Sequence, residues 1–411
     1  MATAAAPLTS PAAAFGHRGF TLYWTARFLA TFAVQVVSVA IGWQVYDLTR
    51  DPLDLGIVGL MQFLPSLALV LVTGPAADRF NRRAIMAFCL IAEILCAAAL
   101  LGLTLAGERR VWPIFAVALG IGVARAFFGP ATQSLVPNLV PPEHLGNAIA
   151  WNSSSRQVAV ITGPVAGGLL YGLAAEAAYA AAVVMLLAAI VSIALIPPPA
   201  QKTAPEPASW NRLVAGFRYV WDHKIVLGAI SLDLFAVLLG GATALLPAYA
   251  RDVLEVGPWG LGVLRAGPGL GALAVALWLA WRPLNDRVGT VMFVNVAAFG
   301  LFTVVFGLST TPWLSVVALA IMGGTDMVSV YVRQTLIQLA TPDEVRGRVN
   351  AVSSVFVGAS NELGEFRAGV SAALIGVVPA VVVGGVATML VAALWAVWFP
   401  ELRRARRLDG S

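Results

Sequence analysis

Two stretches, one in each half of the chain, carry the same residues in the same register. Residues 133–163 read QSLVPNLVPPEHLGNAIAWNSSSRQVAVITG, and residues 334–364 read QTLIQLATPDEVRGRVNAVSSVFVGASNELG. Matched pairs lie 201 positions apart and include Gln133 with Gln334, Pro141 with Pro342, Glu143 with Glu344, Gly146 with Gly347, Ser153 with Ser354, and Gly163 with Gly364. Gly and Ser recur in any packed helix bundle, but this does not explain Gln, Pro and Glu in register. The offset indicates a duplicated half.

The composition around these stretches is that of a membrane protein. Of 411 residues, 59% are hydrophobic and 11% charged, and the mean hydropathy is +0.84. Soluble domains carry about 25% charged residues. A membrane-spanning helix needs about 20 apolar residues, and the chain offers twelve such segments: 20–46, 55–77, 84–106, 112–135, 147–172, 177–196, 225–250, 259–281, 290–308, 312–335, 346–375 and 378–399.

A polar, proline-rich break after the sixth segment divides the chain. We therefore predict an all-α polytopic membrane protein with twelve transmembrane helices in two pseudo-symmetric six-helix bundles. Its parts are a cytoplasmic tail (1–19), an N-terminal bundle (20–196), a cytoplasmic linker (197–224), a C-terminal bundle (225–399) and a basic cytoplasmic tail (400–411). Repeated halves of this kind are typical of secondary transporters, whose substrate site lies between the halves at mid-membrane.

The basic residues predict the orientation. With both termini in the cytoplasm, sixteen Lys and Arg residues fall on the cytoplasmic side and four on the other. Cytoplasmic loops carry the excess of Lys and Arg, so we predict a multi-pass protein of the inner (plasma) membrane with cytoplasmic termini. Because the basic residues occupy short loops between apolar segments, the net charge of +5 does not indicate nucleic-acid binding.

The loop after the second segment has a charged motif that could act as a gate. It contains Gly74, Asp78, Arg79, Arg82 and Arg83. Glycine permits close helix approach, and an acid at a helix end can pair with an arginine in one conformation and release it in another. Topology anchoring by the arginines is the alternative reading. The motif resembles the signature cytoplasmic loop of the major facilitator superfamily, and the resemblance covers the whole chain.

Two further motifs narrow the resemblance. Arg125-Ala-Phe-Phe-Gly129 is similar to the Arg-x-x-Gln-Gly element of drug:proton antiporters, with Phe128 in place of Gln. Residues 159–168 resemble the antiporter motif Gly-x-x-x-Gly-Pro-x-x-Gly-Gly, and its small residues predict close helix packing: Gly163, Pro164, Gly167 and Gly168. Segments at 232–235, 240–247 and 361–366 resemble the enterobactin-exporter-like branch of the superfamily. The resemblance implies export.

Ionisable residues within the spans are the candidates for coupling, because a charge in the bilayer is costly unless it meets a cavity or a partner. The proton-coupling candidates are Asp233, Asp326, Glu93, Glu362 and Glu365. Asp233 and Asp326 have few basic neighbours in their own half, which favours proton carriage there. Glu93 could instead pair with Arg125. Glu362 and Glu365 share a helix face, so one should be protonated or paired, for instance with Arg367.

Three arginines near span ends have two open interpretations. Arg27, Arg265 and Arg333 could line a polar site or extend to the membrane interface. The substrate-cavity candidates are Gln35, Arg125, Trp43 and Phe235, although both aromatic residues could equally face lipid or the core.

These features predict a proton-coupled exporter of a small organic molecule, siderophore-like or drug-like, that works by alternating access. We expect it to be a monomer in membrane lipid, with protons and the solute as partners. The alternatives are a lipid or lysolipid translocator on the same fold, and a non-transporting scaffold or sensor. The histidines fall in cytoplasmic segments and no phosphate-binding loop is present, so we expect no enzyme activity, cofactor, metal site or nucleic-acid partner.

Overall fold

The computed structural model describes residues 12–197, 217–284 and 286–405, and within these ranges it contains helices and no strands. The first half consists of α1 (Arg18–Thr49), α2 (Pro52–Ala68), α3 (Val70–Arg79), α4 (Arg82–Leu105), α5 (Trp112–Leu135), α6 (Pro142–Leu173) and α7 (Ala175–Ala194). The second half consists of α9 (Lys224–Gly240), α11 (Pro258–Trp281), α12 (Val288–Leu308), α13 (Pro312–Ala340), α14 (Asp343–Ile375), α15 (Val377–Trp398) and the short α16 (Pro400–Arg404). Most of the predicted linker lies outside the described residues.

Nine helices in the described part of the chain are long and apolar enough to cross a membrane by composition alone. The predicted second, fifth and eleventh spans are not among these nine helices, and each has a local cause. The predicted second span is divided at Leu69 into α2 and α3, and prolines lie inside both pieces. The helices α6 and α14, which contain most of the duplicated stretches, carry Arg, Glu, Asn and Ser. Their polar composition follows from their position, because both contribute to the charged cavity between the halves.

The seventh span is also interrupted. The helix α9 ends at Gly240, and three short turns continue the span: η3 (Thr243–Leu245), α10 (Leu246–Ala248) and η4 (Tyr249–Val253). Two consecutive glycines and Pro247 explain the interruption, because glycine disfavours a regular helix and proline cannot donate a backbone hydrogen bond. Broken helices of this kind are tolerated in membranes where they line a cavity.

Each half has its own core, and the halves meet through two equivalent helix pairs. One hydrophobic cluster belongs almost entirely to the first half, and three smaller clusters belong mainly to the second. The contacts between halves are dominated by α6 with α11 and by α2 with α14. One pair joins spans five and eight, and the other joins spans two and eleven. Because the duplication makes span five equivalent to span eleven and span two equivalent to span eight, the two contacts are equivalent.

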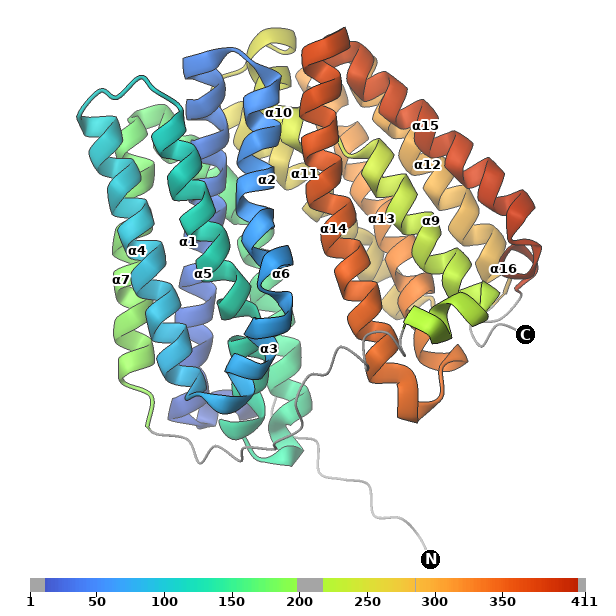
Figure 1. The fold of residues 1–411 in the computed structure, drawn as a ribbon, viewed down its shortest axis with the longest axis horizontal. Helices are drawn as coiled ribbons and strands as arrows, with labels where there is room; N and C mark the ends of the chain where they lie inside the picture. The colour runs from blue at the N-terminus through green and yellow to red at the C-terminus, as the bar shows by residue number, and fades with distance from the viewer. Residues whose placement is uncertain (1–11, 198–216, 285, 406–411) are drawn as a thin grey trace, which may run out of the picture.

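Glycines make these contacts close at one end of the molecule. A Cβ on Gly56 of α2 would lie 3.1 Å from the carbonyl oxygen of Phe366 and 3.3 Å from the Cα of Gly369, both on α14. A Cβ on Gly262 of α11 would lie 2.5 Å from the carbonyl oxygen of Pro164. Figure 1 shows the two bundles meeting at the end where α1 stops and α2 begins, and diverging toward the opposite end. We call the end at which they meet the closed end.

Candidate functional site

A cavity of about 260 Å³ lies between the halves. From the first half, it is lined by α1, α2, α5 and α6. From the second half, it is lined by α11, by α14 and by the turns that follow α9. Four charged residues face it: Arg125, Arg265, Glu362 and Glu365. A site built from both halves can change shape when the halves move relative to one another, as alternating access requires.

Neutral groups hold three of these charges in place. Arg125 Nη1 donates to Gln62 Oε1 at 3.0 Å, and Arg265 Nη1 donates to Ser38 Oγ at 2.7 Å. Thr243 Oγ1 donates to Glu365 Oε1 at 3.2 Å. Among the described residues, neither arginine is within ion-pair distance of a carboxylate. Of the two interpretations of Arg265, the structure supports a polar site, since this residue lines the cavity.

A second chamber of about 280 Å³ adjoins the first within the N-terminal half. It shares the lining residues Gln35, Arg125 and Val160 with the cavity between the halves, so the two volumes are adjacent. It adds Arg27, Glu93 and Arg156, together with Phe128, the residue that departs from the antiporter element. The two predicted cavity residues Gln35 and Arg125 therefore lie at the junction of the two chambers.

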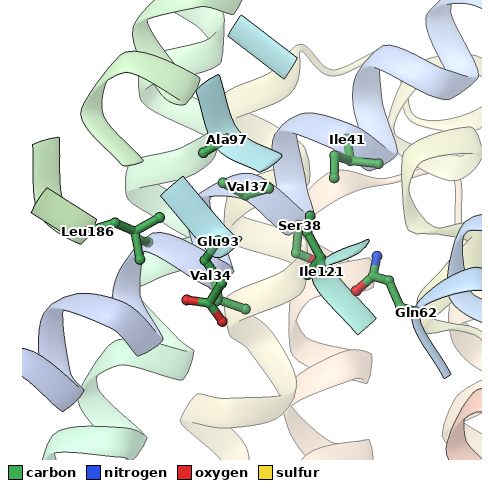
Figure 2. A pocket seen from close by; sticks show the side chains of 10 residues that line it. Val34, Val37, Ser38, Ile41, Gln62, Glu93, Ala97, Ile121 and Leu186 are labelled. Atoms are coloured by element: carbon green, nitrogen blue, oxygen red, sulfur yellow. The ribbon is translucent and has the colours of Figure 1, made fainter. Parts of the chain in front are cut away.

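Glu93 is buried between this chamber and a small apolar pocket. Its exposed fraction is 4%, and its Oε2 has no hydrogen-bond partner among the described residues. Figure 2 shows Glu93 among mainly apolar side chains, with Ser38 and Gln62 as the other labelled polar groups. Because Arg125 bonds to Gln62 and no Arg125–Glu93 ion pair is formed, the pairing considered from the sequence is absent from the described residues. A buried carboxyl group without a partner favours the neutral, protonated form.

Asp233 and Asp326 lie in a separate small pocket inside the C-terminal half, between α9, α12 and α13. Asp233 forms an ion pair with Arg333, and the two side chains are 7% and 5% exposed. The expectation that Asp233 has few basic neighbours in its own half did not anticipate this pair. Of the two interpretations of Arg333, the structure supports a buried polar contact. The sequence reasoning missed this pair because the partners are 100 positions apart and meet only when α9 packs against α13.

Trp43 and Phe235, predicted as cavity residues, lie away from the cavity lining. Trp43 is buried at 7% exposure in the core near the closed end, with the Arg251 guanidinium 5.5 Å from its ring centroid. Phe235 is 38% exposed and packs against Trp395, with the ring centroids 5.1 Å apart. Glu362 and Glu365 face Gly59 of α2, whereas Arg367 donates at 3.5 Å to the carbonyl of Gly241.

Two arginines of the loop motif bind helix C-termini. Arg82 donates to the carbonyl oxygen of Ser134 at the end of α5 at 2.7 Å, and Arg83 donates to Ala194 and Ile196 at the end of α7 at 2.6 Å. Cations are favourable at helix C-termini, where unpaired carbonyls carry partial negative charge. Gly74 has open space around its Cα, and Arg79 is exposed. The side chain of Asp78 lies outside the described part of the structure.

Two crossing ion pairs join the halves at the closed end. Arg50 pairs with Asp252 at 3.2 Å, and Arg251 pairs with Asp47. The Tyr46 hydroxyl also donates to Asp252. A signal for this contact was present in the sequence, because the dipeptide Arg50-Asp51 recurs as Arg251-Asp252 at the same offset of 201.

The antiporter-motif glycines contact both halves. A Cβ on Gly163 would lie 2.6 Å from Gln35 Cβ, and one on Gly167 would lie 2.9 Å from Val36 Cα, both on α1. A Cβ on Gly168 would lie 2.3 Å from the carbonyl oxygen of Pro258 in the other half. The motif thus packs α6 against its own bundle and against the opposite one.

Gly168→Ala should therefore shift the protein toward a state in which the closed end opens. The added methyl group cannot fit beside the Pro258 backbone, and overpacking of a close contact costs about 1–3 kcal/mol. Spin labels at Leu105 and Trp313, two exposed positions on opposite halves, should report longer distances by double electron–electron resonance. Gly172→Ala is the matched control, since a Cβ at Gly172 meets nothing within 4 Å. Equal distance distributions in the two variants would contradict this role for Gly168.

Comparison with known proteins agrees with this architecture. The sequence model described as Major Facilitator Superfamily matches residues 23–365. The chain is 26% identical over 403 residues to proteins named "Enterobactin exporter EntS" from Citrobacter koseri and Escherichia coli, and each alignment covers 95% of this chain and 94% of the relative.

Solved transporter structures show the same fold. The nucleoside transporter NupG superposes with a TM-score of 0.70 at 13% identity, covering 93% of this chain and 99% of NupG. A bacterial homologue of the iron transporter ferroportin, in an inward-facing state, gives a TM-score of 0.67 at 16% identity, covering 93% and 98%. The match to the family across most of the chain and the twelve-helix, two-bundle fold lead to one conclusion: the chain belongs to the Major Facilitator Superfamily and is a membrane transporter, not an enzyme.

Proposed function

We propose that this transporter is a proton-coupled exporter of a small organic molecule that works by alternating access between its two six-helix bundles. The observation that carries the proposal is the charged cavity between the halves, which is sealed at one end by glycine contacts and crossing ion pairs. The bundles 20–196 and 225–399 would move as two bodies joined by the 197–224 linker. The loop motif around Asp78 would stabilise the state in which the opposite end is closed.

Proton coupling is supported by carboxyl groups at suitable positions. Glu93 is buried beside the second chamber, and Glu362 and Glu365 face the cavity between the halves. Asp326 lies in the pocket of the C-terminal bundle. Such groups can bind a proton in one state and release it in another, because a neutral carboxyl group crosses the membrane core at lower cost than a carboxylate. Asp233, with Arg333 beside it, is better suited to a structural role.

The direction of transport and the class of solute are inferred from relatives and motifs. The curated relatives named above are described as exporters of enterobactin, and the motif at residues 159–168 resembles that of antiporters. We therefore propose export of a siderophore-like or drug-like organic solute across the inner membrane. Apolar lining by Leu55, Val58 and Leu246 beside the charged groups suits an organic solute with polar substituents.

The decisive experiment is solute accumulation in everted membrane vesicles that contain the full-length protein. A panel of labelled organic solutes should include at least one that accumulates when the vesicle interior is acidified, and the accumulation should disappear when a protonophore removes the gradient. Vesicles without the transporter provide the background. Accumulation that ignores the pH gradient would contradict proton coupling, and absence of accumulation for every solute in the panel would contradict export.

The predicted orientation can be tested with two single cysteines. In a variant lacking Cys89 and Cys96, Gly16→Cys should resist a membrane-impermeant maleimide in intact cells, whereas Arg109→Cys should react. Both positions are exposed, so a difference in labelling reports the side of the membrane rather than burial. The Lys and Arg distribution places Gly16 in the cytoplasm and Arg109 outside. Efficient labelling of Gly16→Cys from outside would show that the orientation is opposite to the predicted one.

A further inference from the structure

The cavity between the halves holds a positive and a negative site on the same stretch of α2. Gly59 and Gln62 both line it. They are three positions apart, which corresponds to about 4.5 Å along the helix axis. Gln62 positions Arg125, and Gly59 lies against the two glutamates of α14. The helix therefore sets the separation of the opposite charges.

The positive site has unused hydrogen-bonding capacity. Arg125 Nη1 donates to the neutral amide oxygen of Gln62 at 3.0 Å. A guanidinium has five N–H donors arranged to bind a carboxylate through two parallel hydrogen bonds. No carboxylate among the described residues is within ion-pair distance of Arg125. This side chain is consequently held in the cavity by a neutral partner, with N–H donors left for a carboxylate.

The negative site depends on the absence of a side chain at position 59. A Cβ on Gly59 would lie 3.0 Å from Glu365 Oε2 and 4.0 Å from Glu362 Oε2, so both carboxyl groups lie over this residue. Thr243 occupies one oxygen of Glu365. Two carboxyl groups three residues apart on a helix repel one another when both are charged, and a cationic or hydrogen-bond-donating group between them would relieve the repulsion.

We propose that the transported solute is dipolar: its anionic group binds Arg125, and its cationic group binds Glu362 and Glu365. A solute with only one charge would satisfy one site and leave the other without a charged partner. Arg265, the other cavity arginine, bonds to Ser38 on α1 and is not assigned to either site. This inference rests on the proposed transport function and specifies its substrate class.

Three probes with one aromatic body separate the two sites. L-phenylalanine carries both charges, its methyl ester only the positive one, and N-acetyl-L-phenylalanine only the negative one. Binding to the purified full-length protein in lipid nanodiscs would be measured by equilibrium dialysis with labelled probes at millimolar concentrations. Because a hydrogen bond to a charged group contributes about 1.5–3 kcal/mol, L-phenylalanine should bind roughly tenfold to a hundredfold more tightly than either derivative.

Two variants identify which residue binds which end. Arg125→Gln should reduce L-phenylalanine binding to the level of the methyl ester and leave the ester unaffected. The double variant Glu362→Gln and Glu365→Gln should reduce L-phenylalanine binding to the level of the N-acetyl derivative and leave that derivative unaffected. Arg110→Gln is the control, because Arg110 pairs with Glu108 away from the cavity. It should bind all three probes as the wild type does.

Equal affinity for the three probes, binding of none of them, or an equal loss of all three in each variant would overturn the inference. The vesicle experiment separates this failure from failure of the proposed function. If another solute still accumulates in response to the pH gradient, the dipolar substrate class alone is wrong. If no solute in the panel accumulates, both the exporter function and the substrate class that rests on it are wrong.

Discussion

Asp233→Asn should destabilise the folded transporter by about 3–5 kcal/mol, since it leaves the Arg333 guanidinium as a buried, unpaired charge. The two side chains are 7% and 5% exposed, so water cannot replace the lost carboxylate. A thermal unfolding experiment on the detergent-purified protein should show a lower midpoint, together with reduced yield of monodisperse protein. Asp286→Asn is the control: Asp286 and Arg287 are 70% and 79% exposed, and an exposed ion pair contributes about 0–1 kcal/mol.

A double variant distinguishes an ion pair from a proton carrier at this position. Asp233→Asn combined with Arg333→Met removes both charges, and replacing a buried pair by neutral groups of similar volume is often tolerated. We therefore expect the double variant to recover much of the lost stability and to retain proton-driven export. Normal stability in Asp233→Asn, accompanied by loss of proton-driven export, would instead assign Asp233 to coupling.

Glu93→Gln should abolish concentrative export while leaving downhill exchange of the solute. Moving a carboxylate through the membrane core costs about 2.5–3.5 kcal/mol, which slows reorientation of the deprotonated carrier roughly a hundredfold. Glutamine is neutral at every pH, so the variant can reorient without a proton and the solute gradient is no longer linked to the pH gradient. In everted vesicles the ratio of the solute concentration inside to that outside should fall to one, and its dependence on the pH gradient should disappear.

The control for this prediction retains the carboxyl group. Glu93→Asp should keep a measurable response to the pH gradient, because the titrating group remains in the same pocket on a shorter side chain. The Glu93→Gln protein should fold normally, since no ion pair to Glu93 is lost among the described residues. Concentrative export by Glu93→Gln with the wild-type pH profile would exclude Glu93 as the proton carrier and leave Glu362, Glu365 and Asp326 as candidates.

The helical content, the membrane location and the division into two halves were predictable from local properties of the chain. Apolar segments of about 20 residues form helices in lipid because every backbone group must find a hydrogen-bond partner within its own segment. The offset of 201 residues predicted equivalent halves, and the structure joins those halves through equivalent helix pairs. Boundaries differed where prolines and paired glycines interrupt the helices, at Leu69 and after Gly240.

The candidate site was only partly predictable. Polar residues in apolar spans were recognised as exceptional, which marked Gln35 and Arg125 as cavity candidates and Glu362 and Glu365 as coupling candidates. All four line the cavity. Their partners were not identified. Periodicity indicates which residues share a face of one helix, but it does not indicate which other helix that face contacts.

Hydropathy and the distribution of basic residues thus determine the number, order and predicted orientation of the helices, because both act within one span or one loop. Tertiary packing alone decides that Asp233 meets Arg333, that Arg50 and Arg251 form crossing ion pairs, and that Gly59 faces Glu365. These contacts join residues 100 to 306 positions apart. Their free energies depend on distance and local dielectric in the folded protein, and neither quantity can be read from one segment of the chain.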